Sequence, residues 1–295
     1  MAVSLVERMD FYREKIDAAL ERTIPVPVTS DPVSLVREAM RYSLLSEGKR
    51  VRPMLTLAFC ELCGGEVERA LPFACAVEMV HTYSLIHDDL PCMDDDDLRR
   101  GNPTNHKVYG ESIALLAGDG LLTKAFEIAL SAENHTAAVQ AALILARCAG
   151  DAGMVGGQCA DLTSEGGEVD LELLSAMDMG KTVALIDAAC RMGCVAGAGG
   201  EPLLKAAGWY AKGLGMAFQI RDDILDVRGD AERLGKNVGM DSIRDKRNYV
   251  SLLGVEKAQA LVDEYTVSAV AALDAFSGDT SFLRELALIL AQREN

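Results

Sequence analysis

Residues 74–97, ACAVEMVHTYSLIHDDLPCMDDDD, begin as an apolar run and end with six aspartates within ten positions. Steps of three and four residues return to the same face of an α-helix, so His81, Ser84 and Asp88 share one face if this run is helical. The stretch therefore predicts a largely buried helix that carries polar side chains along one face, with an acidic segment directly after it.

Pro91 marks the expected end of this helix. Proline has no amide hydrogen to bond to His87, so the helix should bend or end near Leu90. The chain beyond can then bring Asp94 back beside Asp88. Crowded aspartates repel one another and need a positive neighbour, and oxygen-only ligands suit Mg²⁺ or Ca²⁺ rather than zinc. An exposed acidic loop is the alternative for this cluster alone; the central Gly and terminal Glu of an EF-hand are missing.

A second acidic cluster bears on the choice between a metal site and an exposed acidic loop. Residues 218–226 read FQIRDDILD, which places Asp222 and Asp226 on one helix face with Gln219 just before them. Two apolar helices that carry carboxylates can face each other and hold metal ions between them, as helical bundles do. A metal site is therefore a better interpretation than two coincidental acidic segments.

Cations stand close to both clusters in the sequence. Residues 48–53, GKRVRP, hold three cations in four positions, Arg99 and Arg100 follow the first cluster directly, and Lys181, Lys236 and Lys246 accompany the second half. Arginine binds phosphate through two parallel hydrogen bonds, and lysine acts as a mobile point charge. Each of these residues alone is usually a surface residue. Together they predict a pocket for two phosphorylated groups, one held by metal and one held by side chains.

The composition of the 295 residues favours one all-α domain. Hydrophobic residues make up 49% and aromatic residues only 5%, so the core must consist mainly of Ala, Leu, Val, Ile and Met, which are compatible with helices. Seven of the eight prolines lie at or before Pro103, which leaves a long stretch suited to successive helices. No repeat or linker interrupts the chain, so a single domain over residues 1–295 is expected.

The bulk charge and the termini limit the possible partners. A net charge of −16 argues against nucleic acid, although a local basic cluster can still bind a small phosphorylated ligand. The first residues are too charged for a signal peptide, and no apolar run reaches the roughly 18 residues that a membrane span needs. The eight cysteines are interpreted as reduced, small hydrophobic residues, so a cytoplasmic protein is expected.

These motifs resemble the trans-prenyl diphosphate synthases, most of all the bacterial farnesyl diphosphate synthases. The resemblance runs in family order from about residue 40 to 254. It implies a helical bundle of the isoprenoid synthase type around a central cavity. The matching blocks are Gly48-Lys49-Arg50-x-Arg52-Pro53, Asp88-Asp89-x4-Asp94, Arg99-Arg100-Gly101, Gly118–Leu122, Gly156-Gly157-Gln158 with Asp161-Leu162, Lys181-Thr182, Asp222-Asp223-x-x-Asp226, Gly235-Lys236 and Lys246.

The resemblance also implies a role for each matching residue. The Mg²⁺ ions that bind the allylic diphosphate would be held by the aspartates of both motifs, Asp88, Asp89, Asp94, Asp222, Asp223 and Asp226. The allylic substrate would contact Arg99, Lys181, Thr182, Gln219 and Lys236. Isopentenyl diphosphate, which carries no metal of its own, would contact Lys49, Arg52, His81 and Arg100, and Lys246 would join the substrate-binding residues.

The implied reaction explains these residue types. Breaking the allylic C–O bond places negative charge on the departing diphosphate and positive charge on carbon. Metals and cationic side chains stabilise the first. A dry cavity, with oxygens such as those of Thr182 and Gln219 nearby, protects the second. Isopentenyl diphosphate then attacks in a head-to-tail (1′-4) condensation, first on dimethylallyl and then on geranyl diphosphate, and the released diphosphate takes the proton.

Tyr83 is the expected determinant of product length. It stands five residues before Asp88, which corresponds to roughly 7.5 Å along a helix, or about one isoprene unit. A bulky residue there predicts the fifteen-carbon farnesyl diphosphate, with geranylgeranyl diphosphate as the alternative. Two departures from the family pattern, Val183 and Asn248, remove no ligand.

Two rival functions fit the sequence less well. A terpene cyclase normally needs only one substrate diphosphate, which leaves the Lys49–Arg52 block and the second aspartate motif unexplained. A non-catalytic regulatory subunit of a prenyl synthase would be expected to lose one aspartate motif, whereas both are intact. The family usually forms homodimers, so a homodimer is expected here.

Overall fold

The computed structural model describes residues 4–28, 31, 33–164, 167–234 and 248–293, with the side chains of 228–234 left aside. These residues form two compact units, one made of residues 1–144 and 192–198 and the other of residues 145–191 and 199–295. Helices α7 (His135–Ala149) and α10 (Ala184–Ala196) each pass from one unit to the other. A single domain over residues 1–295 stays a prediction.

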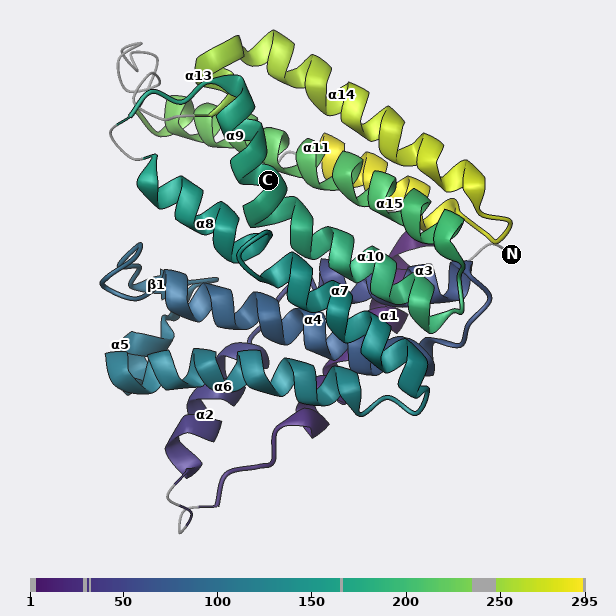
Figure 1. The fold of residues 1–295 in the computed structure, drawn as a ribbon. Helices are drawn as coiled ribbons and strands as arrows, with labels where there is room; N and C mark the ends of the chain where they lie inside the picture. Colours follow the sequence, from purple (N-terminus) through teal and green to yellow (C-terminus); the bar gives the residue numbers. More distant parts are fainter. Residues whose placement is uncertain (1–3, 29–30, 32, 165–166, 235–247, 294–295) are drawn as a thin grey trace. The chain divides into compact units, whose positions relative to one another are not determined.

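The first unit is built on a central buried helix. That helix, α4 (Val67–Asp88), packs against α3 and α6, and Figure 1 shows α4 and α6 side by side. Gly118 permits this contact, because a Cβ there would lie 2.1 Å from Nε2 of His87. The other elements of this unit are α1 (Leu5–Thr23), α2 (Ser34–Leu44), α3 (Val51–Leu62), the hairpin strands β1 (Leu98–Arg99) and β2 (Asn102–Pro103), α5 (Asn105–Tyr109) and α6 (Glu111–Leu130).

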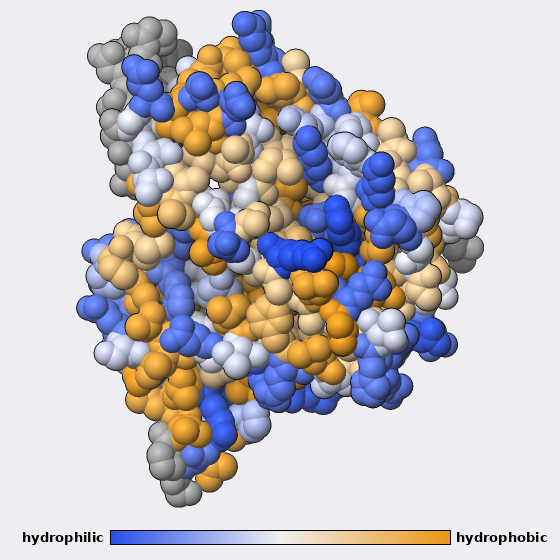
Figure 2. All heavy atoms as spheres, in the orientation of Figure 1, coloured by the Kyte–Doolittle hydropathy of each residue, from blue (hydrophilic) through white to orange (hydrophobic). Residues whose placement is uncertain are grey.

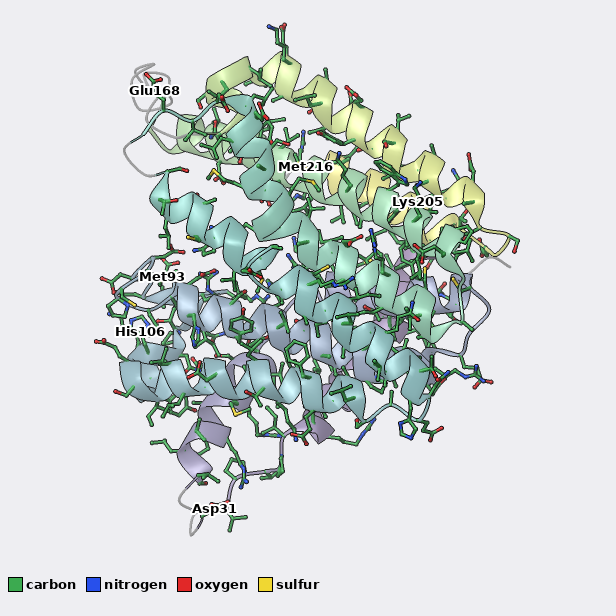
Figure 3. All side chains as sticks on the ribbon, viewed as in Figure 1. Asp31, Met93, His106, Glu168, Lys205 and Met216 are labelled. Atoms are coloured by element: carbon green, nitrogen blue, oxygen red, sulfur yellow. The ribbon has the colours of Figure 1, made fainter. Side chains whose placement is uncertain are left out.

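The second unit is organised around the long helix α11 (Glu201–Leu234), which packs along α14 (Val255–Ala272) (Figure 1). Gly213 allows the close approach, since a Cβ there would lie 2.5 Å from the carbonyl oxygen of Tyr265. Met216, labelled in Figure 3, belongs to the buried core of this unit. The remaining elements are α8 (Met154–Thr163), α9 (Leu171–Asp178), the π-helical η1 (Met179–Val183), α13 (Tyr249–Leu253), the 3₁₀-helical η2 (Leu273–Ala275) and α15 (Ser281–Gln292).

The predicted all-α class is confirmed, because β1 and β2 form the only strands among the described residues. Thirteen side chains of α4 are buried, and those of residues 73–80 form an unbroken run, so this helix is buried on all sides as a core helix is. The predicted end of this helix is confirmed as well: α4 ends at Asp88, three residues before Pro91. The central cavity of the expected bundle stays a prediction.

One described stretch, His135–Thr163, is apolar and long enough to cross a membrane by length and composition alone. It consists of α7, a turn at residues 150–153, and α8, with 15 residues in α7 and 10 in α8. A single spanning helix needs about 20 residues, and buried core helices pass the same test. The expectation of no membrane span stays a prediction.

Candidate active site

The first aspartate motif forms a tight turn at the end of α4. The amide of Asp94 donates a hydrogen bond of 2.8 Å to the carbonyl oxygen of Asp88, and the amide of Met93 donates one of 2.8 Å to Leu90. Asp95 follows with a φ of 52°, a left-handed conformation that Asp tolerates better than most residues. Figure 3 shows Met93 in this turn. The predicted return of Asp94 to the side of Asp88 is confirmed.

Asp89, the second residue of the motif, is turned toward Arg99. Nε of Arg99 donates to Oδ1 of Asp89 at 2.6 Å, and Nη2 of Arg99 donates to Oδ2 of Asp96 at 3.2 Å. The Asp89 side chain is buried, which raises its pKa, while the positive charge of Arg99 opposes that rise. Asp89 therefore holds Arg99 in place in this structure, and its predicted role as a metal ligand stays a prediction.

Three predicted residues of the metal-free diphosphate site lie together in the first unit. Nη1 of Arg52 lies 3.4 Å from Nε2 of His81, and Nε of Arg52 is buried without a hydrogen-bond partner in the described part of the chain. Burial lowers the pKa of Arg52; the charge of Glu78 opposes this effect and that of Arg100 adds to it. Burial and the charges of Arg52 and Arg100 also hold the pKa of His81 well below its usual value. Such a group of cations with a neutral imidazole is suited to bind an anion.

Gly48 makes room for Arg100. A Cβ at Gly48 would lie 2.4 Å from Nη1 of Arg100, which donates a hydrogen bond of 3.0 Å to the carbonyl oxygen of Glu47. The neighbouring Lys49 is exposed. Any larger residue at position 48 would therefore displace the guanidinium of Arg100 from the place it has in this structure.

Arg50 has a structural role that the sequence did not reveal. Its guanidinium is buried, donates to Oε1 of Glu78 at 2.7 Å and to Oδ1 of Asp17 at 3.0 Å, and also bonds the carbonyl oxygens of Leu44 and Ser46. These contacts fix the loop between α2 and α3. Glu78, an acid inside the apolar run of α4, was the available signal for a buried cation.

Tyr83 is buried and its ring meets that of His87 edge-on, with the centroids 5.7 Å apart. Nε2 of His87 in turn lies 3.0 Å from the carbonyl oxygen of Leu115 in α6. Ser84 stands four residues before Asp88, hence on the same helix face as Asp88. The small serine rather than the tyrosine is therefore in line with the first aspartate.

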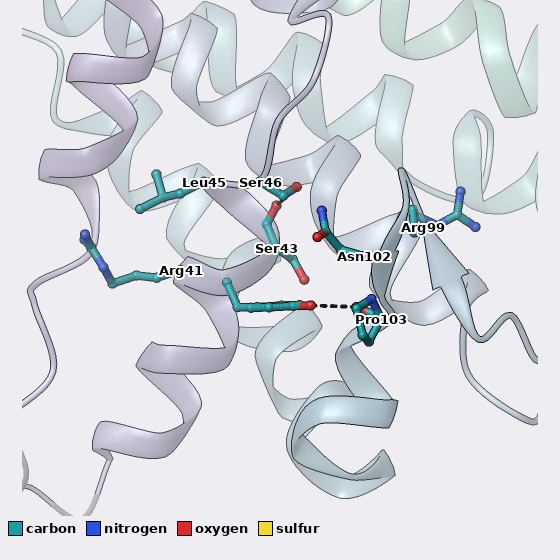
Figure 4. A pocket seen from close by; sticks show the side chains of 8 residues that line it. Arg41, Ser43, Leu45, Ser46, Arg99, Asn102 and Pro103 are labelled. Atoms are coloured by element: carbon teal, nitrogen blue, oxygen red, sulfur yellow. Dashed lines mark hydrogen bonds between the residues drawn. The ribbon is translucent and has the colours of Figure 1, made fainter.

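A pocket of about 400 Å³ lies between the end of α2 and the hairpin that carries Arg99 (Figure 4). The hydroxyl of Tyr42 donates to the carbonyl oxygen of Pro103 across it, at 2.8 Å. The Arg41 and Arg99 side chains point away from each other in Figure 4. Arg41 donates to the carbonyl oxygens of Glu21 and Ile24. The pocket is thus no site where two arginines converge on a phosphate.

In the second unit, Lys181 lies in the π-helical segment η1 and faces α8. Its Nζ donates to Oδ2 of Asp161 at 2.6 Å. The two elements touch through backbone, because a Cβ on Gly157 would lie 2.1 Å from the amide nitrogen of Lys181. Short π-helical segments are frequent at functional sites. Gly157 is therefore needed to seat η1 against α8.

Thr182 and Gln219, both predicted to lie near the allylic carbon, are hydrogen-bonded to each other. Oγ1 of Thr182 donates to Oε1 of Gln219 at 3.1 Å. The bond joins η1 to α11 inside the second unit, and both side chains are partly buried. The structure thus brings this predicted pair together.

The second aspartate motif lies on α11 in a strongly acidic environment. Burial raises the pKa of Asp223 to about 6, and the negative charges of Asp226 and Asp222 add to this rise. The backbone amide of Tyr249 donates a hydrogen bond of 2.9 Å to Asp223 and opposes the rise. Burial and the charge of Asp223 raise the pKa of Asp178 to about 7. The sequence analysis missed Asp178, although an acid three residues before Lys181 in an apolar run was a signal.

The donor chemistry of both motifs fits Mg²⁺. Carboxylate oxygens are the ligands that this ion prefers, and it usually takes one or two carboxylates together with substrate phosphates. Among the described residues, no group of three or more His, Cys, Asp or Glu is already arranged to hold a metal. The charges of Asp222 and Asp226 raise the pKa of Asp223, so the motif concentrates negative charge that a cation would neutralise. Lys236 and Lys246 lie outside the described residues.

Comparison with known proteins identifies the family of the chain. The sequence profile of the polyprenyl synthetase family matches residues 33–272. The chain belongs to the polyprenyl synthetase family. Membership makes it a prenyltransferase of isoprenoid biosynthesis that elongates prenyl diphosphates.

Three similar proteins illustrate the family. The chain is 45% identical to geranylgeranyl pyrophosphate synthase 7, chloroplastic, of Arabidopsis thaliana, covering 99% of this chain and 83% of that enzyme. It is also 45% identical to the heterodimeric geranylgeranyl pyrophosphate synthase large subunit 1, chloroplastic, of the same plant, covering 96% and 77%. A crystal structure of an FPP/GFPP synthase from Zymomonas mobilis superimposes with a TM-score of 0.88 at 37% identity, covering 99% of this chain and 100% of that one.

Two expectations from the sequence need correction or revision. The expected cytoplasmic location is contradicted, because the plant relatives are chloroplastic by name. The same relatives are named geranylgeranyl rather than farnesyl synthases, so they do not support farnesyl diphosphate as the product. The expected location was wrong because neither the reduced cysteines nor the charged first residues identify the compartment in which an enzyme works.

Proposed function

We propose that this polyprenyl synthetase is a Mg²⁺-dependent geranylgeranyl diphosphate synthase. It adds isopentenyl diphosphate head-to-tail to allylic diphosphates until the chain has twenty carbons. The observation that carries the prenyl-transfer part of the proposal is the separation of two kinds of residues: carboxylates on α4 and α11, and a separate group of cations around Arg52. An enzyme that handles two diphosphates with different demands for metal requires this division.

The cationic group of the first unit is assigned to isopentenyl diphosphate. Arg52 and Arg100 supply fixed positive charge, exposed Lys49 adds a mobile one, and neutral His81 can donate one hydrogen bond. The unpartnered Nε of Arg52 is a buried donor that lacks an acceptor among the described residues. A diphosphate oxygen would satisfy it.

The allylic diphosphate is assigned to the aspartates of both motifs with Arg99 and Lys181. When bound, Mg²⁺ supplies the positive charge that stabilises the departing diphosphate. Arg99 is oriented by Asp89, and Lys181 by Asp161, so both cations are already positioned for an anion. Lys236 and Lys246, outside the described residues, are proposed to complete this set.

Thr182 and Gln219 are assigned to the developing positive charge on the allylic carbon. Their mutual hydrogen bond fixes the direction of both side-chain oxygens. Oriented dipoles that need no rearrangement during the reaction are the most effective form of electrostatic stabilisation. The protein itself needs no carboxylate base, because the released diphosphate can accept the proton.

The twenty-carbon product is supported by the relatives and by the place of Tyr83. The two plant enzymes at 45% identity are geranylgeranyl synthases by name. The Tyr83 ring contacts the ring of His87, which itself contacts α6, whereas Ser84 lies on the same helix face as Asp88. A chain that grows along the Asp88 face of α4 would meet the small serine first, which leaves room for another five carbons.

Farnesyl diphosphate is the second candidate, and one observation favours it. Tyr83 is a large, buried side chain roughly one and a half helical turns before the first motif, and a modest rotation of its ring would shorten the space for product. The solved Zymomonas mobilis relative is named for farnesyl and longer products together.

We further propose that the enzyme is a homodimer, and that the interface between its two subunits includes α6 and the first part of α7. Leu115 and Leu116 on α6 and Val139 and Leu143 on α7 are large hydrophobic residues that are at least 47% exposed. Figure 2 shows hydrophobic side chains on the surface over α6. Exposed apolar side chains of this kind mark association sites. One plant relative is by name the large subunit of a heterodimer, so it supports association with a second subunit but not the identity of that subunit.

A choice of starter substrates tests the proposed product. The enzyme is given Mg²⁺, labelled isopentenyl diphosphate and one of dimethylallyl, geranyl or farnesyl diphosphate, and the products are measured by mass spectrometry. A geranylgeranyl diphosphate synthase accepts all three and ends at twenty carbons. Refusal of farnesyl diphosphate, with accumulation of the fifteen-carbon product from the other two, would establish the second candidate instead.

A further inference from the structure

The end of the chain returns to the second aspartate motif. Arg293 directly follows α15, and its Nη2 forms an ion pair with Oδ1 of Asp222. The same nitrogen lies 3.4 Å from the carbonyl oxygen of Phe218, and the guanidinium carbon lies 4.0 Å from the centre of the Phe218 ring. The side chain of Arg293 is only 13% exposed. Arg293 is thus partly buried against α11.

A second set of contacts fixes the backbone of Arg293. Nε and Nη2 of Arg221 donate to the carbonyl oxygen of Arg293 at 2.9 and 2.6 Å, and Nη1 of Arg221 donates to Oε1 of Gln259 in α14 at 2.9 Å. Arg221 and Asp222 follow Phe218 by three and four residues, so each of them lies beside Phe218 on the surface of α11. Both the backbone and the side chain of Arg293 are therefore held by one helix face.

This arrangement is more specific than an ordinary surface ion pair. Long exposed side chains contribute little because they must be ordered to meet, whereas Arg293 is held by an aromatic ring, a carbonyl oxygen and a carboxylate at once. Its Nε is buried without a hydrogen-bond partner in the described part of the chain. Such a buried donor lowers stability, so maximal stability alone does not explain the arrangement.

We propose that Arg293 is a positioning residue that orients the Asp222 carboxylate for Mg²⁺. The inference rests on the proposed function, in which Asp222 is a metal ligand. Hydrogen bonds from neighbouring groups set the direction of a ligating carboxylate, and their loss typically costs 10–100-fold in metal affinity or activity. The rigid guanidinium fork of arginine is better suited to this task than a lysine ammonium. The charge of Arg293 also offsets the repulsion among Asp222, Asp223 and Asp226.

The test compares Arg293→Ala and Arg293→Lys with a matched control, Arg284→Ala. Arg284 lies in α15, the helix that ends directly before Arg293, and pairs with Asp274 at 2.5 Å, but that pair is on the surface and includes no residue of the motif. Two quantities are measured. One is the Mg²⁺ concentration for half-maximal turnover. The other, which needs no turnover, is the Mg²⁺ concentration for half of the thermal stabilisation produced with inorganic pyrophosphate.

We expect Arg293→Ala to raise both Mg²⁺ midpoints about 10–100-fold. Arg293→Lys should shift them less, since it keeps the charge, and it provides a folded variant if the alanine protein is unstable. Arg284→Ala should leave both midpoints at their wild-type values.

Unchanged Mg²⁺ midpoints in Arg293→Ala or Arg293→Lys, even with a lower melting temperature, would overturn the inference and leave Arg293 a purely structural contact. Lower midpoints would overturn it too, because they would mean that Arg293 competes with the metal. Failure of the proposed function is recognised separately: wild-type protein would then form no elongated product, while the pyrophosphate measurement would still report on Arg293.

Discussion

At the scale of single residues, the two aspartate motifs differ in what surrounds them. Asp88 ends a helix and is joined to Asp94 by a backbone hydrogen bond, whereas Asp222 lies within α11 and is held by Arg293. Their neighbours Asp89 and Asp223 are engaged by Arg99 and by the Tyr249 amide. In each motif, a neighbouring donor thus holds the second aspartate in place, which fixes the backbone beside the first aspartate.

Asp88→Ala should nearly abolish turnover and leave the fold intact. Asp88 is the last residue of α4 and only partly buried, so truncating its side chain leaves the buried core of the helix unchanged, but the proposed metal site loses a ligand. Loss of one such electrostatic contact typically costs on the order of 10²–10³ in kcat. The measurement is steady-state turnover at saturating Mg²⁺, together with thermal unfolding.

Asp95→Asn is the matched control for Asp88→Ala. It removes a charge from the same turn, and asparagine tolerates the φ of 52° at this position. Turnover of this variant should stay within about twofold of wild type. Asp88→Ala activity within the same range would contradict the metal assignment.

Residues that act through distant partners were the hardest to predict. Lys181, Thr182 and Gln219 were proposed from the sequence, and the structure brings the last two together. Arg50 and Arg293 were not recognised, because the partners of each, such as Glu78 for Arg50 and Asp222 for Arg293, lie far away in sequence. Helical spacing relates only residues three or four apart, so a sequence can indicate a cation without indicating its counter-ion.

At the scale of elements, helical periodicity predicted the helices but not their irregularities. The proline-poor stretch and the apolar spacing predicted the all-α fold, and Pro91 predicted the end of α4. The π-helical segment η1 was not foreseen, since its Met179–Val183 sequence has no local feature that distinguishes it from an α-helix. The short hairpin of β1 and β2, which carries Arg99, also escaped the sequence analysis.

The contact between α8 and η1 gives a prediction at this scale. In Gly157→Ala, the new Cβ would lie 2.1 Å from the backbone nitrogen of Lys181, and backbone cannot move aside as a side chain can. We expect a loss of about 1–3 kcal/mol in the free energy of unfolding, with a further loss of turnover because Lys181 and Thr182 shift. Chemical denaturation and turnover measure the two effects.

Gly200→Ala is the control for Gly157→Ala. Its Cβ would meet only the Cδ of Pro202, at 3.8 Å, which is an ordinary contact. Stability and turnover of this variant should match wild type. Wild-type stability in Gly157→Ala would contradict the backbone contact between α8 and η1.

At the scale of the whole molecule, the two units carry different parts of the chemistry. The first holds the cations around Arg52 and the first aspartate motif; the second holds Lys181, Thr182, Gln219 and the second motif. The family, and with it the prenyl transfer, was recognisable from the order of the motifs. Product length and compartment were not, because one depends on how side chains such as Tyr83 are directed and the other leaves no trace in the motifs.

The most direct test of the account is Mg²⁺-dependent elongation by the purified wild-type protein. It is incubated with dimethylallyl diphosphate and labelled isopentenyl diphosphate, with Mg²⁺ or with a chelator, and the products are separated by mass. We expect elongated prenyl diphosphates, up to twenty carbons, only in the presence of Mg²⁺. A folded protein that incorporates no labelled isopentenyl diphosphate under these conditions would contradict it.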